Sequence, residues 1–120
     1  MTKSILKEKS FKFAARAVKF YKYMREKKKE YILSKQVLRS GTSIGAMIRE
    51  AEYSESKIDF VHKLAVAQKE TNETMYWLEL LEATDYISKK DFENIYADAT
   101  EILKIITSSI NTVKSKLPKK

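Results

Sequence analysis

The sequence predicts an all-α fold, an antiparallel up-down four-helix bundle, from its composition and its hydrophobic periodicity. The 120-residue chain contains only two Gly and one Pro, whereas turn-rich β folds use both residues often. Four stretches repeat apolar residues at the helical period, and short polar breaks separate them. Helices joined by short turns pack against their neighbours in the sequence. Because a chain of this length can form one core, residues 1–120 are expected to make a single domain.

The first helix is expected at about residues 4–26. Its wheel places Phe13, Ala17, Phe20 and further apolar residues on one half and lysines on the other, which is typical of a helix that buries one face. Ser4 suits the N-cap position, because its hydroxyl can accept a hydrogen bond from a first-turn amide. The hydrophilic segment REKKKE is expected to end the helix and begin the first turn.

The second helix is expected at about residues 33–52, with an apolar stripe that runs from Leu33 to Ala51. Gly41 and Gly45 lie one turn apart within it. A glycine inside a helix costs about 1 kcal/mol relative to alanine. The pair therefore predicts a close approach of this helix to a neighbouring one.

The third and fourth helices are expected at about residues 56–84 and 88–116. Ser56 and Ser88 are the expected N-caps, and an aspartate follows each of them by three positions. That spacing resembles a capping box, and an acidic side chain in the first turn is also favoured by the helix dipole.

The charge is unevenly distributed along the chain. Residues 1–39 carry 13 Lys and Arg against 3 acidic residues, a balance of +10. Residues 40–112 carry 7 against 13, a balance of −6, and the last eight residues add +4. A basic part beside an acidic part suggests a polyanionic partner or charge-complementary self-assembly.

The basic face of the first helix is the main candidate for binding nucleic acid. Its cations from Lys9 to Lys19 span about 15 Å at the helical rise, a spacing that suits successive phosphates. Tyr23 falls on the same face and could stack on an unpaired base. The alternative is a solvated face that keeps the protein in solution. The full candidate set is Lys9, Lys12, Arg16, Lys19, Lys22, Tyr23, Lys27, Lys28 and Lys29.

Three short motifs resemble a known family. They are Q-x-x-R-S-x-x-S-I at Gln36, Arg39, Ser40, Ser43 and Ile44, D-F at Asp59 and Phe60, and E-T-x-Y-W-L-E-L from Glu73 to Leu80. The chain resembles the four-helix-bundle proteins encoded in intervening sequences of 23S ribosomal RNA genes. The resemblance implies a ring-shaped homo-oligomer, a homopentamer, while the biochemical role of the family is undefined. A related branch of the fold is the accessory protein of diversity-generating retroelements, which works with a reverse transcriptase and nucleic acid.

The Arg39, Ser40 and Ser43 group interrupts an apolar helix with polar side chains. A buried guanidinium needs a charged partner, so one interpretation is a structural polar network in which Arg39 pairs with Glu50 or Glu70. The other interpretation is a site for RNA or another anion. Many family members read E-G where this chain has Glu50 followed by alanine, so the second helix is expected to end less sharply.

Several apolar residues lie off the main stripes, among them Val66, Trp77, Leu80, Ile87 and Ile105. A lone four-helix bundle would leave them exposed, which suggests a second buried surface and hence an oligomer. Tyr76, Trp77 and Leu80 are the expected oligomer interface. They could instead bind a partner protein, because aromatic residues dominate such sites.

No arrangement of residues indicates catalysis, a cofactor or a metal. His62 is the single histidine and there is no cysteine, so a Ser-His-Asp triad lacks a signature and a di-metal site lacks its second histidine. No phosphate-binding glycine loop is present. The absence of an apolar leader or of a membrane-length apolar run leads us to expect a cytoplasmic protein that does not enter the membrane.

These observations favour a non-enzymatic, oligomeric nucleic-acid-binding module without cofactors, with RNA favoured over DNA. The expected partners are further copies of the chain, RNA or DNA, and a protein partner. The alternative function is a protein-interaction or assembly scaffold without nucleic-acid binding.

Overall fold

The computed structural model describes residues 2–118, with side chains from residue 5 onward, and this part of the chain is entirely helical with no strand. The elements are α1 (Thr2–Tyr23), one π-helical turn η1 (Met24–Lys28), α2 (Leu33–Glu52), α3 (Lys57–Ala83) and α4 (Lys89–Lys114). The predicted all-α class and its four helices are confirmed.

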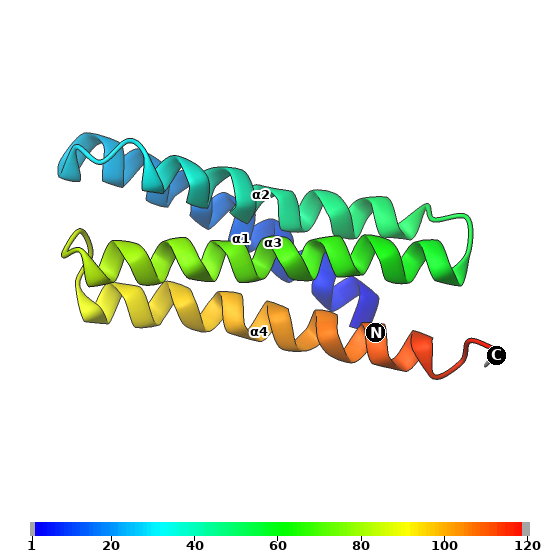
Figure 1. Cartoon of the computed structure of the whole chain (residues 1–120). Coiled ribbons are helices and arrows are strands. Elements are labelled where there is room, and N and C mark those ends of the chain that lie inside the picture. The colour runs from blue at the N-terminus through cyan, green and yellow to red at the C-terminus, as the bar shows by residue number, and fades with distance from the viewer. Residues whose placement is uncertain (1, 119–120) are drawn as a thin grey trace.

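The four helices lie alongside one another in an elongated molecule of 51 × 23 × 22 Å (Figure 1). In Figure 1, α2, α3 and α4 lie side by side, and α1 crosses behind them. Each helix contacts the next one along the chain, and α1 also contacts α4. The η1 turn and the α3–α4 turn therefore lie at the same end of the molecule, and the α2–α3 turn lies at the other (Figure 1).

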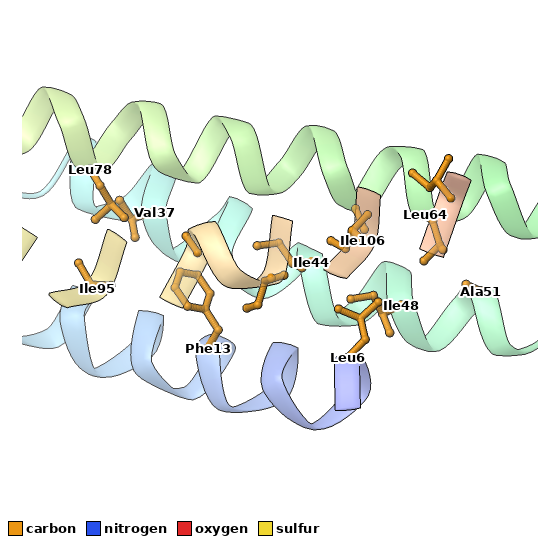
Figure 2. Close-up of a cluster of buried hydrophobic side chains, with 14 of the residues drawn as sticks. Leu6, Phe13, Val37, Ile44, Ile48, Ala51, Leu64, Leu78, Ile95 and Ile106 are labelled. Carbon is orange, nitrogen blue, oxygen red and sulfur yellow. The ribbon is translucent and has the colours of Figure 1, made fainter. Parts of the chain in front are cut away.

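The core is a continuous column of aliphatic side chains with one aromatic ring. Figure 2 shows Phe13 of α1, Ile44 of α2, Leu78 of α3 and Ile106 of α4 directed into this column, and all four are buried. Burying a side chain of this size stabilises the fold by about 1.5–3 kcal/mol. The apolar residues that recur at the helical period in the sequence are therefore the ones that form the core.

Gly41 of α2 allows α1 to pack closely, as predicted for the glycine pair, whereas a Cβ at Gly45 would make contacts of ordinary length. A Cβ added at Gly41 would lie 3.0 Å from the Cβ of Ala17, and one added at Gly45 would lie 3.4 Å from the carbonyl oxygen of Ser10. The first distance is tighter than ordinary contacts between two methyl groups, so a side chain at Gly41 would require α1 or α2 to shift by a few tenths of an ångström.

The N-cap prediction for α1 is wrong. The helix begins at Thr2, so Ser4 lies within it instead of before it. Its end also differs from the expected residue 26, because the π-helical turn η1 extends α1 through Lys28. Lys29 then adopts a left-handed conformation with φ 54°, and the amide of Glu30 donates to the carbonyl of Met24 over 3.1 Å.

Glu30 caps α2 from outside the helix. Its carboxylate accepts hydrogen bonds from the amides of Ile32 at 3.1 Å, Leu33 at 2.9 Å and Ser34 at 2.7 Å. Burial of Glu30 by itself raises the pKa of its carboxyl, but the hydrogen bonds from these amides and from the side chain of Ser34 together outweigh burial and hold the pKa below its usual value. They satisfy amides that have no partner within the helix.

The predicted caps of α3 and α4 are confirmed. The hydroxyl of Ser56 accepts from the amide of Asp59 at 3.0 Å, and that of Ser88 accepts from the amide of Asp91 at 3.1 Å. Without the glycine, α2 ends at Glu52, the expected residue. The amide of Tyr53 donates to the carbonyl of Glu50 at 3.0 Å, and a short segment leads into α3.

Ile87 does not belong to an outer apolar surface, contrary to the sequence-based interpretation. It is buried and packs against the end of the core. Within residues 2–118, none of the helices combines the length and the apolar character that crossing a bilayer requires.

Candidate nucleic-acid interface

The polar face of α1 carries the expected row of cations, but its members differ in their surroundings. Lys12, Lys19 and Lys22 are exposed, and none of them forms an ion pair with a described side chain. Tyr23, on the same face, is 46 % exposed. These residues remain available to an external ligand.

Two cations of this face already have acidic partners on α4. The Nζ of Lys9 lies 3.2 Å from Glu101, and the Nη1 of Arg16 lies 2.6 Å from Asp98. Arg16 also donates to the side-chain oxygen of Asn94. Both pairs are solvent-exposed, so each stabilises the fold by less than about 1 kcal/mol, but each lowers the net positive charge in the middle of α1.

A second group of cations lies at the end of the molecule that holds both η1 and the α3–α4 turn (Figure 1). Lys27, Lys28 and Lys29 are exposed there, in η1 and directly after it. Lys89 and Lys90, in the first turn of α4, are exposed at the same end. These two lysines were not among the expected binding residues because they belong to the acidic part of the chain. The paired lysines after Ser88, at the start of a helix, were the available signal.

The Arg39 group forms a polar network across the outer surface of α2 and α3. Arg39 Nε donates to Gln36 at 3.1 Å, Nη1 donates to Glu70 at 3.4 Å, and Nη2 donates to Glu73. The Nε1 of Trp77 also donates to Glu73, at 3.3 Å. The hydrogen bond to Glu73 raises the pKa of the guanidinium. With two carboxylates already bound, Arg39 has little positive charge left for an external anion.

This network is not buried as the sequence suggested, because the side chain of Arg39 remains 47 % exposed. Glu50, the other expected partner, lies 3.8 Å from Lys63 instead. The buried polar contact is between Ser40 and Thr74, whose hydroxyls lie 2.7 Å apart. The hydroxyl of Ser43 donates to the carbonyl of Arg39 within the helix.

The expected oligomer residues lie on this same outer surface. Tyr76 is 55 % exposed, while Trp77 and Leu80 are half-buried. The rings of Tyr76 and Trp77 meet edge to face with centroids 5.1 Å apart. Of these three side chains, that of Tyr76 is the most exposed in the single chain and contributes least to the core.

The comparisons with known proteins agree with the motifs. The family of 23S rRNA-intervening sequence proteins matches residues 2–108. The chain belongs to this family. The chain is also similar to a crystal structure of a protein of unknown function from the S23 ribosomal protein family of Bacteroides thetaiotaomicron. The two share 52 % sequence identity and a TM-score of 0.91, over 92 % of this chain and 99 % of that one. No curated protein matches the chain.

The motifs that resemble the family contribute both inside and outside the bundle. Ile44 and Ser40 are buried, whereas Gln36, Arg39 and Glu73 build the outer network. His62 is exposed, and the described residues contain no group of three His, Asp or Glu side chains that could hold a metal ion.

Proposed function

We propose that the protein is a non-enzymatic nucleic-acid-binding module, an antiparallel up-down bundle that assembles as a ring-shaped homo-oligomer, a pentamer, in the cytoplasm. The observation that carries this proposal is the set of exposed cations without acidic partners on α1, η1 and the start of α4. They supply the electrostatic attraction that a phosphate backbone needs. A ring would repeat this surface, and repetition increases avidity without strong single contacts.

RNA is favoured over DNA because the family is encoded within ribosomal RNA genes, which is an argument by association. The protein's own surface favours phosphates in general. Its free lysines would each release counterions on binding, so affinity should fall steeply with salt.

The test is a charge-reversal variant, Lys12→Glu, Lys19→Glu and Lys22→Glu, measured against structured RNA, single-stranded RNA and duplex DNA over a salt series. We expect the wild type to bind near physiological salt and the variant to lose at least about tenfold in affinity, because three phosphate contacts are replaced by repulsion. Arg16 is left unchanged, since its contact with Asp98 also joins two helices.

The matched control reverses three exposed lysines elsewhere, Lys57, Lys104 and Lys116, and has the same net charge. Equal losses of affinity in both variants would mean that overall charge, and not the α1 surface, governs nucleic-acid binding. No wild-type binding at physiological salt would reject the nucleic-acid function.

The alternative function is a protein-interaction or assembly scaffold, and the exposed Tyr76 beside Trp77 favours it. Under this alternative, Tyr76→Ala loses a partner protein while the mass of the assembly and the affinity for RNA stay unchanged. Loss of the assembly itself would assign Tyr76 to self-association.

A further inference from the structure

A groove between α1 and α4 lies at the end of the molecule that holds η1 and the α3–α4 turn. Its walls include Lys19 and Tyr23 from α1, Lys90 and Asn94 from α4, and the apolar residues Phe20 and Ile87. Resting on the proposed nucleic-acid function, we propose that this groove binds one unpaired nucleotide of a single-stranded nucleic acid. The base stacks on Tyr23, and the flanking phosphates contact Lys19 and Lys90.

The charges around the groove favour a phosphate backbone. The lining includes three cations, Arg16, Lys19 and Lys90, against one carboxylate, Asp91. Arg16 is held by Asp98, whereas Lys19 and Lys90 have no ion pair among the described side chains. The two free ammonium groups come from different helices, so they can contact phosphates on both sides of one nucleotide.

The aromatic ring indicates which kind of nucleic acid fits. Phe20 packs against the core, but Tyr23 stays 46 % exposed beside it. Stacking of a base on such a ring contributes about 1–3 kcal/mol. A base inside a duplex has both faces covered by its neighbours, so an unpaired base is the ligand that can use Tyr23.

Asn94 adds a directed polar group. Its side-chain oxygen accepts a hydrogen bond from Arg16, which leaves its NH₂ group pointing away from the guanidinium and able to donate. The Arg16–Asp98 contact in turn fixes the guanidinium. Arg16 is thus a positioning residue that presents Asn94 to a carbonyl oxygen of the base.

The experiment measures fluorescence anisotropy of a labelled uridine-rich RNA of about ten nucleotides, which is within the usual site size. The same sequence as DNA distinguishes the two sources of an unpaired nucleotide, and a blunt RNA duplex tests the requirement for an unpaired base. The variants are Lys90→Glu, Tyr23→Ala and Tyr23→Phe. The controls are Lys104→Glu, with the same charge change elsewhere on α4, and Tyr53→Ala, at the α2–α3 turn.

We expect Lys90→Glu and Tyr23→Ala each to weaken single-strand binding by about tenfold, while duplex binding falls by less than about threefold. Tyr23→Phe should bind like the wild type because it keeps the aromatic face. Lys90→Glu should also lower the log–log salt slope by about 0.7, the value for one phosphate contact on a single strand. Tyr23 is exposed enough that the variants should keep the helical content of the wild type.

The outcomes separate the two proposals. Wild-type RNA binding with unchanged affinity in Lys90→Glu and Tyr23→Ala would overturn the groove and leave the nucleic-acid function intact. Equal losses for single strand and duplex would also overturn it. No wild-type binding to any of the three ligands at physiological salt rejects the function and the groove together.

Discussion

The carboxylate of Glu30 is the residue-scale contact with the clearest energetic consequence. It accepts three amide hydrogen bonds at the start of α2 while buried to 7 % exposure. Glu30→Gln removes the charge and one of the two accepting oxygens, so we expect a loss of about 1.5–3 kcal/mol in the free energy of unfolding at neutral pH. Urea denaturation measures it, and Glu26→Gln is the exposed control in the same segment.

The same contact predicts a pH dependence. Because the folded-state pKa of Glu30 is lowered, its stabilisation is present above the unfolded pKa of about 4.3 and is lost as the pH falls through the folded pKa. The difference between wild type and Glu30→Gln should therefore shrink in acid. A difference that stays constant from neutral pH into acid would contradict this assignment.

Tyr96 gives a second residue-scale prediction. Its hydroxyl donates to Glu79 at 2.6 Å, and this hydrogen bond, followed by burial, raises the pKa of Tyr96 to about 12. A raised pKa stabilises the folded state below the unfolded value of 10.0, and that contribution is lost as the pH rises through the folded value.

A titration of the protein's seven tyrosines, followed by phenolate absorbance, should thus show one group that ionises late. Far-UV circular dichroism, recorded in parallel, checks that the helices persist over the same pH range. Tyr96→Phe should remove the late step, and Glu79→Gln should move it to lower pH. A single step for all tyrosines in the wild type would count against the Tyr96–Glu79 contact.

At the scale of elements, the close packing of α1 on α2 depends on Gly41. An added Cβ would lie 3.0 Å from that of Ala17 and 3.5 Å from the ring of Phe13. Overpacking typically costs about 1–3 kcal/mol, and replacing a helical glycine regains about 1 kcal/mol, so we expect Gly41→Ala to be destabilising overall. Gly45→Ala, whose nearest atom is 3.4 Å away, meets no such overpacking and should be stabilising by up to about 1 kcal/mol.

Urea midpoints of these variants test the packing. Combining Gly41→Ala with Ala17→Gly gives a double-mutant cycle, in which removing the opposing methyl should recover part of the loss. Strictly additive effects would show that the two positions do not compete for the same space.

The four helices and the serine caps of α3 and α4 were predictable from the sequence because they depend on residues close in the chain, whereas the cap expected at Ser4 was wrong because α1 begins at Thr2. Glu30 was not recognised, since a carboxylate that folds forward onto the next helix has no simple periodic signature. The pairing of Arg16 with Asp98 depends on how α1 lies against α4, which periodicity does not determine. For the same reason, the basic face of α1 was predictable from periodicity, whereas the position of Lys90 across the groove was not.

At the scale of the whole molecule, we expect one substitution to abolish self-association without changing how a single chain binds a short RNA. Self-association should nevertheless increase the affinity for long RNA. Tyr76 lies on the α2–α3 surface and is 55 % exposed. The lysines without acidic partners lie instead on α1 and at the end of the molecule that holds η1 and the α3–α4 turn. Tyr76→Glu should therefore dissociate the proposed ring and leave the helical content of each chain unchanged, because a charge is costly inside an interface but not in water. Tyr53→Glu, at an 84 % exposed position, is the control. Analytical ultracentrifugation gives the mass.

The dissociated Tyr76→Glu chain should also bind long RNA more weakly than the ring while binding a short oligonucleotide equally well. A long strand can engage several copies of the basic surface at once, and that gain in effective concentration is lost in a monomer. A short strand occupies one copy in either state. Equal affinity of ring and monomer for long RNA would mean that one copy of the basic surface carries the full binding energy. A wild type that sediments as a monomer at micromolar concentration would reject the proposed ring.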